Sequence, residues 1–410
     1  MELSEASQNL MKSLLNNFQT SPACFLEDRS GSAAFQKLSK SLYSEINASY
    51  RVSIGTLPMP KYTTFKRNTP SVPRSPLLDT MPADLRDIVI NNAVGSATYN
   101  WNIGVRNIRI SLVFYSREKM DDIGWTLDLV SLMATWLRMA CNVARESCSS
   151  RSLQTIIYLL PNKKVLPESL INTIGQMHVN SGVATSCQER GEICIYREEE
   201  VLKVFVHETF HALGLDTAGY DDQISLNKIN ELFPIENANI SLREAYTEWW
   251  ARVINCALVC YKNNIHLVQP YDSFAVCLTF AINIERTFAL FQVKKILRHM
   301  GLTLASTHST DESSEMARRV LYREDTPVFS YYILVALMMF DFSALSDSFF
   351  KQNVGLFKLQ TRAAPYAALV ESVHRALSNP CLSDTMLRVT NYNDDLVTER
   401  TTRMSIIELA

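Results

Sequence analysis

Apolar and polar residues follow two different periods in the first half of the chain. Apolar residues three and four positions apart indicate helices, and regular alternation of apolar and polar residues indicates half-buried strands. In chain order these patterns predict two helices, a strand, a heavily buried helix, a second strand and an extended stretch, at about residues 10–15, 35–46, 107–116, 123–139, 153–160 and 182–197.

Beyond residue 240 the helical period dominates. Five helices are expected there, at about residues 242–261, 271–299, 312–323, 328–342 and 364–377. A half that mixes strands with helices therefore precedes a half that is mainly helical. The sequence predicts an α+β fold, in which a mixed sheet packs against a backing helix.

Proline and polar clusters divide the chain further. Six of the 14 prolines fall between residues 57 and 82, which favours an extended linker over regular structure. The stretch after residue 380 is polar and mixed, as in a loosely held tail. We therefore expect an N-terminal helical segment, a proline-rich extended segment, a mixed sheet subdomain, a helical subdomain and a tail, at residues 1–56, 57–103, 104–240, 241–380 and 381–410.

Composition narrows the function classes. The 410 residues are 47% hydrophobic and 20% charged, with a formal net charge of -2, so the basic excess typical of nucleic-acid binding is missing. No glycine-rich phosphate loop occurs, so no nucleotide cofactor is expected. The most apolar uncharged run, residues 326–340, is shorter than the roughly 20 residues of a membrane span. No membrane anchor is expected.

Cysteine usage and the N-terminal residues indicate a compartment. The first residues, MELSEASQNLMKSLL, lack the apolar core of a secretory signal, so an intracellular location is expected. The nine cysteines are odd in number and lie mostly in apolar segments, which predicts buried free thiols in a reducing compartment. Cys256 and Cys260 lack the second pair that a cysteine metal site requires, so we expect them to pack in the core.

The segment VFVHETFHALGLD, residues 204–216, carries the clearest chemistry. Residues four apart lie above one another on a helix, so His207 and His211 can direct both imidazoles at one metal ion. Glu208 can then act as a general base on a metal-bound water without binding the metal. The alternative is an ordinary amphipathic helix, but such a polar cluster is costly to bury without a partner. Gly214 predicts that the helix stops just after the second histidine.

A third ligand is needed, because a catalytic zinc usually takes three protein ligands and leaves one position for water. The helix expected at residues 242–261 offers Glu244 and Glu248 on one face. We assign Glu244 to the metal and Glu248 to a hydrogen bond with a ligating histidine, and the reverse assignment stays open. Asp216 is a further alternative, either as a ligand or as a hydrogen-bond partner of a histidine.

HETFH (residues 207–211) followed by EAYTE (residues 244–248) resembles the zincin superfamily of metallopeptidases and, within it, the gluzincins. In gluzincins a glutamate on a second helix completes the zinc site, and an acidic residue four positions later supports it. The order of strands and helices over about residues 106–261 is also similar, and it implies that residues 192–200 form an edge strand that receives an extended peptide. The phrase spanning residues 180–216 is similar to uncharacterised zincin-like proteins of large DNA viruses.

The resemblance implies a zinc metalloendopeptidase that acts on a peptide or protein, in a host cytoplasm or virion if the protein is viral. Zn²⁺ would be bound by His207, His211 and Glu244, with Glu208 as general base. Gluzincins commonly carry aspartate where this chain has Glu248, so the geometry of that support stays open. The donor that stabilises the developing oxyanion is equally open, among Tyr220, Tyr246, Tyr261, Tyr271, His266 and His299.

Two other functions compete with the peptidase. A non-catalytic zincin-like protein would keep the fold and use its helical half as an interaction surface. A third reading is another metal-dependent hydrolysis, such as amide cleavage in a small molecule. Glu208 favours an enzyme, because a purely structural zinc site has no need of a base. The sequence does not indicate the substrate or the oligomeric state.

Overall fold

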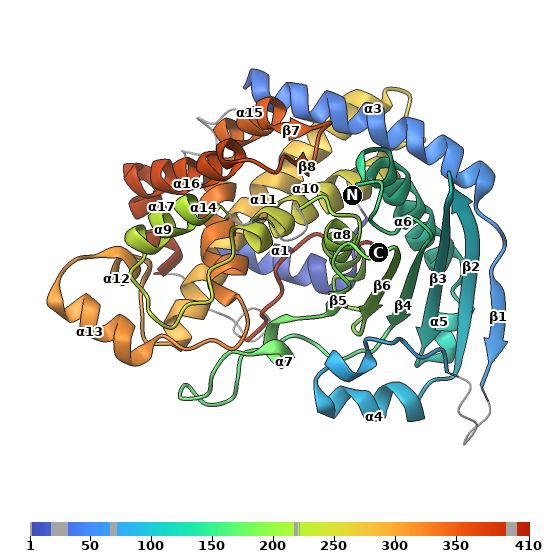
Figure 1. Cartoon of the computed structure of the whole chain (residues 1–410), viewed down its shortest axis with the longest axis horizontal. Helices are drawn as coiled ribbons and strands as arrows, with labels where there is room; N and C mark the ends of the chain where they lie inside the picture. The colour runs from blue at the N-terminus through green and yellow to red at the C-terminus, as the bar shows by residue number, and fades with distance from the viewer. Residues whose placement is uncertain (1, 18–31, 66–71, 217–219, 221, 391–399) are drawn as a thin grey trace. The chain divides into compact units, whose positions relative to one another are not determined.

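The computed structural model describes residues 2–17, 32–65, 72–216, 220, 222–390 and 400–410. The chain divides into two compact units, a sheet unit and a helical unit (Figure 1). The sheet unit comprises Leu42–Lys163, Ser181–Gly219 and Leu409–Ala410. The helical unit comprises Met1–Ser41, Lys164–Asn180 and Tyr220–Glu408. The predicted α+β class is confirmed.

A six-stranded mixed sheet, in the order β1-β2-β3-β4-β6-β5, forms the frame of the sheet unit (Figure 1). The first three strands pair antiparallel, β3, β4 and β6 pair parallel, and β5 runs antiparallel to β6. Strands β1 to β6 span Lys61–Thr64, Gly95–Ile103, Arg106–Phe114, Ser152–Tyr158, Gly182–Ala184 and Arg190–Ile195. The last five residues of β3 are all buried, as expected for a central strand covered on both faces.

Among the described residues, five helices accompany the sheet, and α3 (Ala33–Thr56) contributes residues to both units. The five are η1, α4, α5, α6 and α8, at Leu78–Thr80, Ala83–Asn91, Arg117–Asp121, Ile123–Val143 and Val201–Ala212. The predicted backing helix is α6, and it packs against α8. Trp136 on α6 donates from Nε1 to Thr209 Oγ1 at 2.5 Å, and its ring stacks on Phe210 with centroids 5.5 Å apart. A large buried aromatic side chain therefore holds α8 in place.

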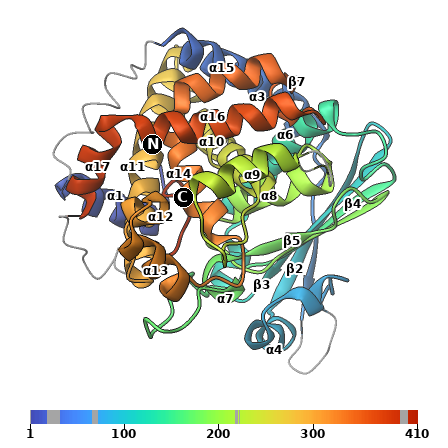
Figure 2. The same ribbon diagram turned by 60° about the vertical axis from the view of Figure 1, so that its left-hand side comes forward.

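The helical unit contains twelve described helices, and Figure 2 shows the whole chain from another side. They are α1, α7, α9 to α13, the π-helix η2, α14, α15, α16 and α17, at Glu5–Asn17, Gln176–Val179, Gln223–Leu232, Leu242–Asn264, Pro270–His299, Leu304–His308, Glu312–Leu321, Phe329–Leu334, Val335–Phe340, Phe342–Gln352, Ala363–Ser378 and Pro380–Thr390. A short hairpin pairs β7 with β8, at Asn353–Val354 and Lys358–Leu359.

The helices predicted after residue 240 are present, with one difference. The stretch expected as a single helix over residues 328–342 begins as the π-helix η2, continues as α14, and bends by 96° into α15. A π turn is wider than an α turn. Within this π-helix the backbone oxygen of Tyr331 accepts a hydrogen bond from Arg252 Nη2 on α10, at 3.1 Å.

The expectation of an extended linker over residues 57–103 is wrong for the described residues of this range, and residues 66–71 lie outside them. That stretch contains β1, α4 and β2, and β2 pairs along its whole length with β3. The prolines cluster before residue 83, whereas β2 carries alternating residues such as Tyr99 and Trp101, both buried, so the proline signal does not extend to it.

The expectation of a loosely held tail is also wrong for the described part of residues 381–410. Helix α17 occupies its start, and residues 402–407 are buried. The carboxylate of Glu285 accepts hydrogen bonds from Ser405 Oγ at 2.5 Å and from the backbone N–H groups of Ile406 and Ile407 at 2.8 and 2.9 Å. Burial nevertheless raises the pKa of Glu285. Ser405 and the backbone N–H groups of Ile406 and Ile407 are thus hydrogen-bonded inside the unit.

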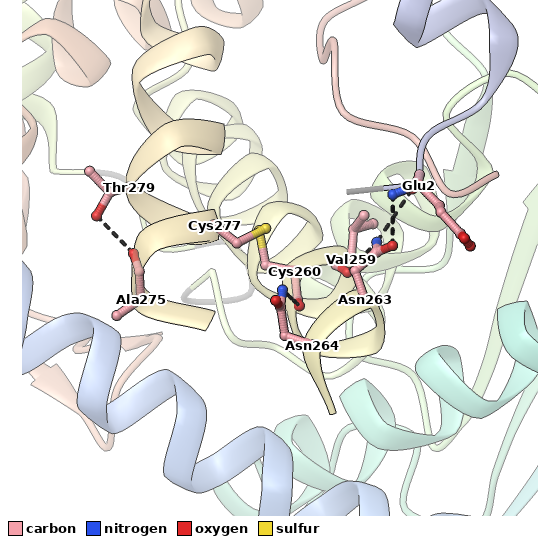
Figure 3. Close-up of a disulfide and its surroundings, with 8 residues drawn as sticks. All are labelled: Glu2, Val259, Cys260, Asn263, Asn264, Ala275, Cys277 and Thr279. Atoms are coloured by element: carbon pink, nitrogen blue, oxygen red, sulfur yellow. Dashed lines mark hydrogen bonds between the residues drawn. A yellow bond between two sulfur atoms is a disulfide. The ribbon is translucent and has the colours of Figure 1, made fainter. Parts of the chain in front are cut away.

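Cysteine pairing differs from the expected free thiols. Disulfides join Cys148 to Cys187 and Cys260 to Cys277, and the second links α10 to α11 (Figure 3). Cys381 is disulfide-bonded too. Cys141, Cys194 and Cys256 are buried and free, as predicted. Pairing is a tertiary property that depends on which segments meet, so an odd count of cysteines does not exclude it.

One described helix, α11, is long and apolar enough to cross a membrane. Of its most apolar window, 67% is buried inside the protein, as in the core helix of a globular unit. The bent pair formed by residues 329–340 and 342–352 passes the same test only if it is counted as one span. The absence of a membrane anchor stays a prediction.

Candidate metal centre

Helix α8 brings the two histidines and Glu208 into a buried setting. Residues 201–210 of this helix are all buried, and the exposed fractions of His207 and Glu208 are both 7%. Val204, Phe205 and the other apolar residues of the helix form its packing surface. The predicted helix is confirmed, and its polar residues lie inside the unit, where they need partners.

The two imidazoles face one another at their outer nitrogens. The Nε2 atoms of His207 and His211 lie 3.2 Å apart, and the rings meet edge to face with centroids 5.0 Å apart. Two nitrogens bound to one tetrahedral zinc at about 2.0–2.1 Å would lie about 3.3 Å apart. The spacing of these nitrogens therefore fits a shared zinc ion.

The tautomer of His211 is set by Asp216. His211 Nδ1 lies 2.7 Å from Asp216 Oδ2, and the Asp216 side chain is fully buried. An ionised carboxylate only accepts hydrogen bonds, so Asp216 in its ionised form places the proton of this pair on Nδ1. In the neutral imidazole the lone pair is then on Nε2, the nitrogen that faces His207. This geometry suits Asp216 to orienting a ligand, which is one of the two roles the sequence left open.

The end of α8 explains how Asp216 reaches a histidine only five residues earlier. Gly214 has a φ of 64°, a left-handed conformation that glycine adopts easily. The N–H of Gly214 bonds to the oxygen of His211 at 3.2 Å, and the N–H of Leu215 bonds to the oxygen of Phe210 at 2.9 Å. This pair of bonds is a Schellman motif, which reverses the chain after the last helical turn. The predicted stop at Gly214 is confirmed.

Replacing Asp216 by Asn should weaken zinc binding by about 10–100-fold, because partners of metal-bound histidines typically have effects of that size. The measurement is a zinc titration against a chromophoric chelator. Asp222→Asn is the matched control, since Asp222 caps α9 in the helical unit by accepting from the N–H of Ser225. Equal affinities in Asp216→Asn and wild type would show that Asp216 does not support a metal ligand.

Strand β5 places the backbone of Gly182 against the side chain of Glu208. A Cβ at Gly182 would lie 2.8 Å from Glu208 Oε1 and 2.9 Å from Val204 Cγ1, closer than real Cβ contacts. Glycine is therefore needed where this strand passes over the helix. The sequence analysis missed Gly182, because a three-residue strand shows no alternation that would place it.

The strand at the sheet edge is not the predicted one. Residues 192–200 were expected to form the edge, but β6 pairs with β4 on one side and with β5 on the other. The edge strand beside α8 is β5 instead. Strand order depends on long-range pairing, which local patterns along residues 182–197 do not reveal.

Gly182→Ala should destabilise the protein by about 1–3 kcal/mol, because the new methyl group has no room beside Glu208. Thermal unfolding measures this, with a lower midpoint expected for the variant. Gly55→Ala is the matched control, since a Cβ there meets nothing within 4 Å. An unchanged midpoint in Gly182→Ala would contradict the close packing of β5 on α8.

Cys194, a buried free thiol of the sheet unit, is not suited to bind a metal. Burial raises the pKa of Cys194 to about 12, and the charge of Glu208 adds to the rise. Metal sites use the thiolate, and Cys194 stays protonated at neutral pH.

The two carboxylates considered as third ligands lie on α10 of the helical unit. Glu244 is half-buried in the first turn, where its N–H bonds to the Ser241 hydroxyl at 3.2 Å. Glu248 is fully buried, and its Oε1 accepts from Arg252 Nε at 2.9 Å. The Ser241 N–H, which a glutamate at this position often caps, donates instead to Ser330 Oγ at 2.8 Å.

One residue among the open oxyanion donors has a clear structural role. Tyr246 Oη donates to the oxygen of Phe357 at 2.7 Å and accepts from Asn353 Nδ2 at 2.9 Å. These contacts attach the β7–β8 hairpin to α10. His299 Nε2 lies 3.3 Å from the oxygen of Asn172.

No protein-family model and no solved structure matches the chain. A curated protein that it is similar to is the uncharacterized protein R210 of Acanthamoeba polyphaga mimivirus, with 22% identity over 195 residues. The match covers 47% of this chain and 48% of that protein, so the chain spans about half the length of this relative. Its name states no activity, and a function must be argued from the site.

Proposed function

We propose that this protein is a zinc-dependent metalloendopeptidase, with His207, His211 and Glu244 as the metal ligands. The observation that carries the proposal is the pair of Nε2 atoms 3.2 Å apart, one of them on a histidine whose Nδ1 is held by Asp216. This donor set suits zinc, whose catalytic sites include sets of two histidines and one glutamate. The segments HETFH and EAYTE, residues 207–211 and 244–248, supply this donor set.

The contacts within α10 favour Glu244 over Glu248 as the third ligand. One oxygen of Glu248 is already bonded to Arg252, and Arg252 also donates to Tyr331 in the π-helix. Moving Glu248 onto a metal would break a buried ion pair, which is strongly unfavourable. Glu244 lies in the first turn of α10 and is half-buried, whereas Glu248 is fully buried.

Zinc, when bound, would lower the pKa of its water towards about 7 and polarise the scissile carbonyl. Glu208 accepts the proton of the attacking water and returns it to the leaving amine. Asp216 keeps the proton of His211 on Nδ1, so that Nε2 remains a ligand. Gly182 leaves the space in which the Glu208 carboxylate lies. The partial match to a mimivirus protein supports a viral setting, in a host cytoplasm or virion.

Two measurements on the purified protein test this function. Elemental analysis should give about one zinc per chain, and a mixed-sequence peptide library should be cleaved at internal bonds in a reaction that a chelator stops and zinc restores. One zinc without cleavage of any library member would favour a non-catalytic interaction module. Cleavage confined to small amides would favour the other hydrolase, and absence of zinc would contradict the metal centre itself.

A further inference from the structure

Two loops, residues 145–149 and 187–188, cap the C-terminal end of α8, and a disulfide joins them. We call them the loop pair. The last carbonyl groups of a helix have no partner within it and need donors from elsewhere. The oxygen of His211 accepts from the N–H of Cys187 at 3.2 Å, and the oxygen of Ala212 accepts from Ser149 Oγ at 3.0 Å. Cys187 is bonded to Cys148, the neighbour of Ser149. Both donors therefore depend on segments held together by one covalent bond.

Other contacts continue the same arrangement. The N–H of Arg145, three residues before Cys148, donates to the oxygen of Leu213 at 3.2 Å. The N–H of Ser149 donates to the oxygen of Gln188 at 2.6 Å, so the two loops are also bonded to one another. Three consecutive carbonyls at the end of the metal-binding helix thus bond to this loop pair.

The backbone of both loops is held in an unfavourable conformation beside the disulfide. Ser149 has a φ of 48° and Cys187 a φ of 50°, in the left-handed region that residues other than glycine rarely occupy. Such residues keep their conformation only when the surroundings constrain it. The Cys148–Cys187 bond closes a sequence separation of 39 residues and supplies such a constraint.

We propose that the Cys148–Cys187 disulfide is a redox clamp on the metal-binding end of α8. While the disulfide is intact, it keeps Cys187 N–H and Ser149 Oγ hydrogen-bonded to the carbonyl oxygens of His211 and Ala212, and so keeps His211 in place. After reduction the two loops relax, the carbonyls lose these donors, and the protein binds zinc less tightly. The effect on zinc binding rests on the proposed function, whereas the clamp itself concerns only the C-terminal end of α8.

The reductant that fits is a dithiol. Cys187 is half-buried whereas Cys148 is fully buried, so a thiolate attacks the Cys187 sulfur and Cys148 leaves and takes up a proton. The second thiol of the reductant then displaces Cys187, which also gains a proton. Two electrons and two protons pass to the protein, and the reductant becomes a disulfide.

The second disulfide provides a matched control. Cys260–Cys277 joins α10 to α11 in the helical unit, where Figure 3 shows it beside the side-chain amides of Asn263 and Asn264. Removing Cys260–Cys277 also takes away a disulfide, but this bond lies in the helical unit, whereas α8 belongs to the sheet unit. A Cys148→Ser/Cys187→Ser variant and a Cys260→Ser/Cys277→Ser variant therefore separate the clamp from general loss of a cross-link.

Hydrogen exchange on the metal-free proteins tests the clamp without any need for activity. Peptides covering residues 207–216 should exchange at least about fivefold faster in Cys148→Ser/Cys187→Ser than in wild type, because capping bonds are lost. The control variant should match wild type in these peptides. Zinc affinity should fall about tenfold in the first variant alone.

A titration with dithiothreitol in a Cys260→Ser/Cys277→Ser/Cys381→Ser variant gives the same test without mutating the clamp, because Cys381 is disulfide-bonded as well. This titration replaces the first variant if that variant does not fold. Exchange that stays slow after reduction of Cys148–Cys187 would overturn the proposal, and so would equal acceleration in both serine variants. Faster exchange in a protein that binds no zinc would leave the clamp standing and refute the metal centre.

Discussion

Replacing Glu208 by Gln is expected to lower kcat for peptide cleavage by about 10³-fold while the protein keeps its zinc, because general-base catalysis typically contributes 10²–10⁴-fold. Glutamine matches glutamate in size and fills the same space under Gly182, but it cannot take a proton from water. The expected result is therefore a loss of turnover without loss of fold or metal. Steady-state kinetics on a cleaved library peptide and zinc analysis of the same sample measure both quantities.

The matched control is Glu192→Gln, on β6 of the same unit, where burial raises the pKa of the carboxyl and no metal role is proposed. This variant should retain the kcat of wild type. If Glu208→Gln cleaved peptides at the wild-type rate, the assignment of the general base would be wrong. If it lost zinc as well as activity, Glu208 would contribute to the metal site directly.

Removing the third ligand is expected to have the largest effect on metal content. Glu244→Ala should weaken zinc binding by more than about 100-fold, because an inner ligand matters more than the supporting residues, whose loss costs 10–100-fold. The fold should survive, since Glu244 is half-buried and the cap of α10 relies on Ser241 and Ser330. A chelator titration and thermal unfolding of the same variant measure the two effects.

Replacing Glu248 should lower the stability of the protein more, and its zinc affinity less, than replacing Glu244. Glu248→Ala leaves Arg252 buried without its carboxylate and should cost about 3–5 kcal/mol of stability. Zinc affinity should fall less than in Glu244→Ala. Stoichiometric zinc in Glu244→Ala together with a metal-free, folded Glu248→Ala would reverse the assignment of ligand and support, the alternative that the sequence leaves open.

Local periodicity was enough to predict α8 and the residues it carries. The spacing of His207 and His211 requires a helix to bring their side chains together, and Gly214 marks the turn that lets Asp216 fold back. The long apolar period of α6 likewise predicts a buried helix, because nearly every face of it is apolar. These features depend on residues within one or two turns of each other.

Features that depend on distant segments could not be predicted in this way. The edge position of β5 and the contact of Gly182 with Glu208 follow from strand order, which no local pattern encodes. The pairing of Cys148 with Cys187 follows from where two loops meet. The buried residues 402–407 follow a polar stretch of the sequence, and their place in the core becomes clear only with the partner Glu285.

The most direct test of the metal centre is anomalous diffraction from crystals of the wild-type protein, recorded on both sides of the zinc absorption edge. We predict one strong peak about 2.0–2.2 Å from Nε2 of His207, Nε2 of His211 and a carboxylate oxygen of Glu244, with a water in the remaining position. No peak in zinc-supplemented crystals, or a peak bound without the two histidines, would contradict the account.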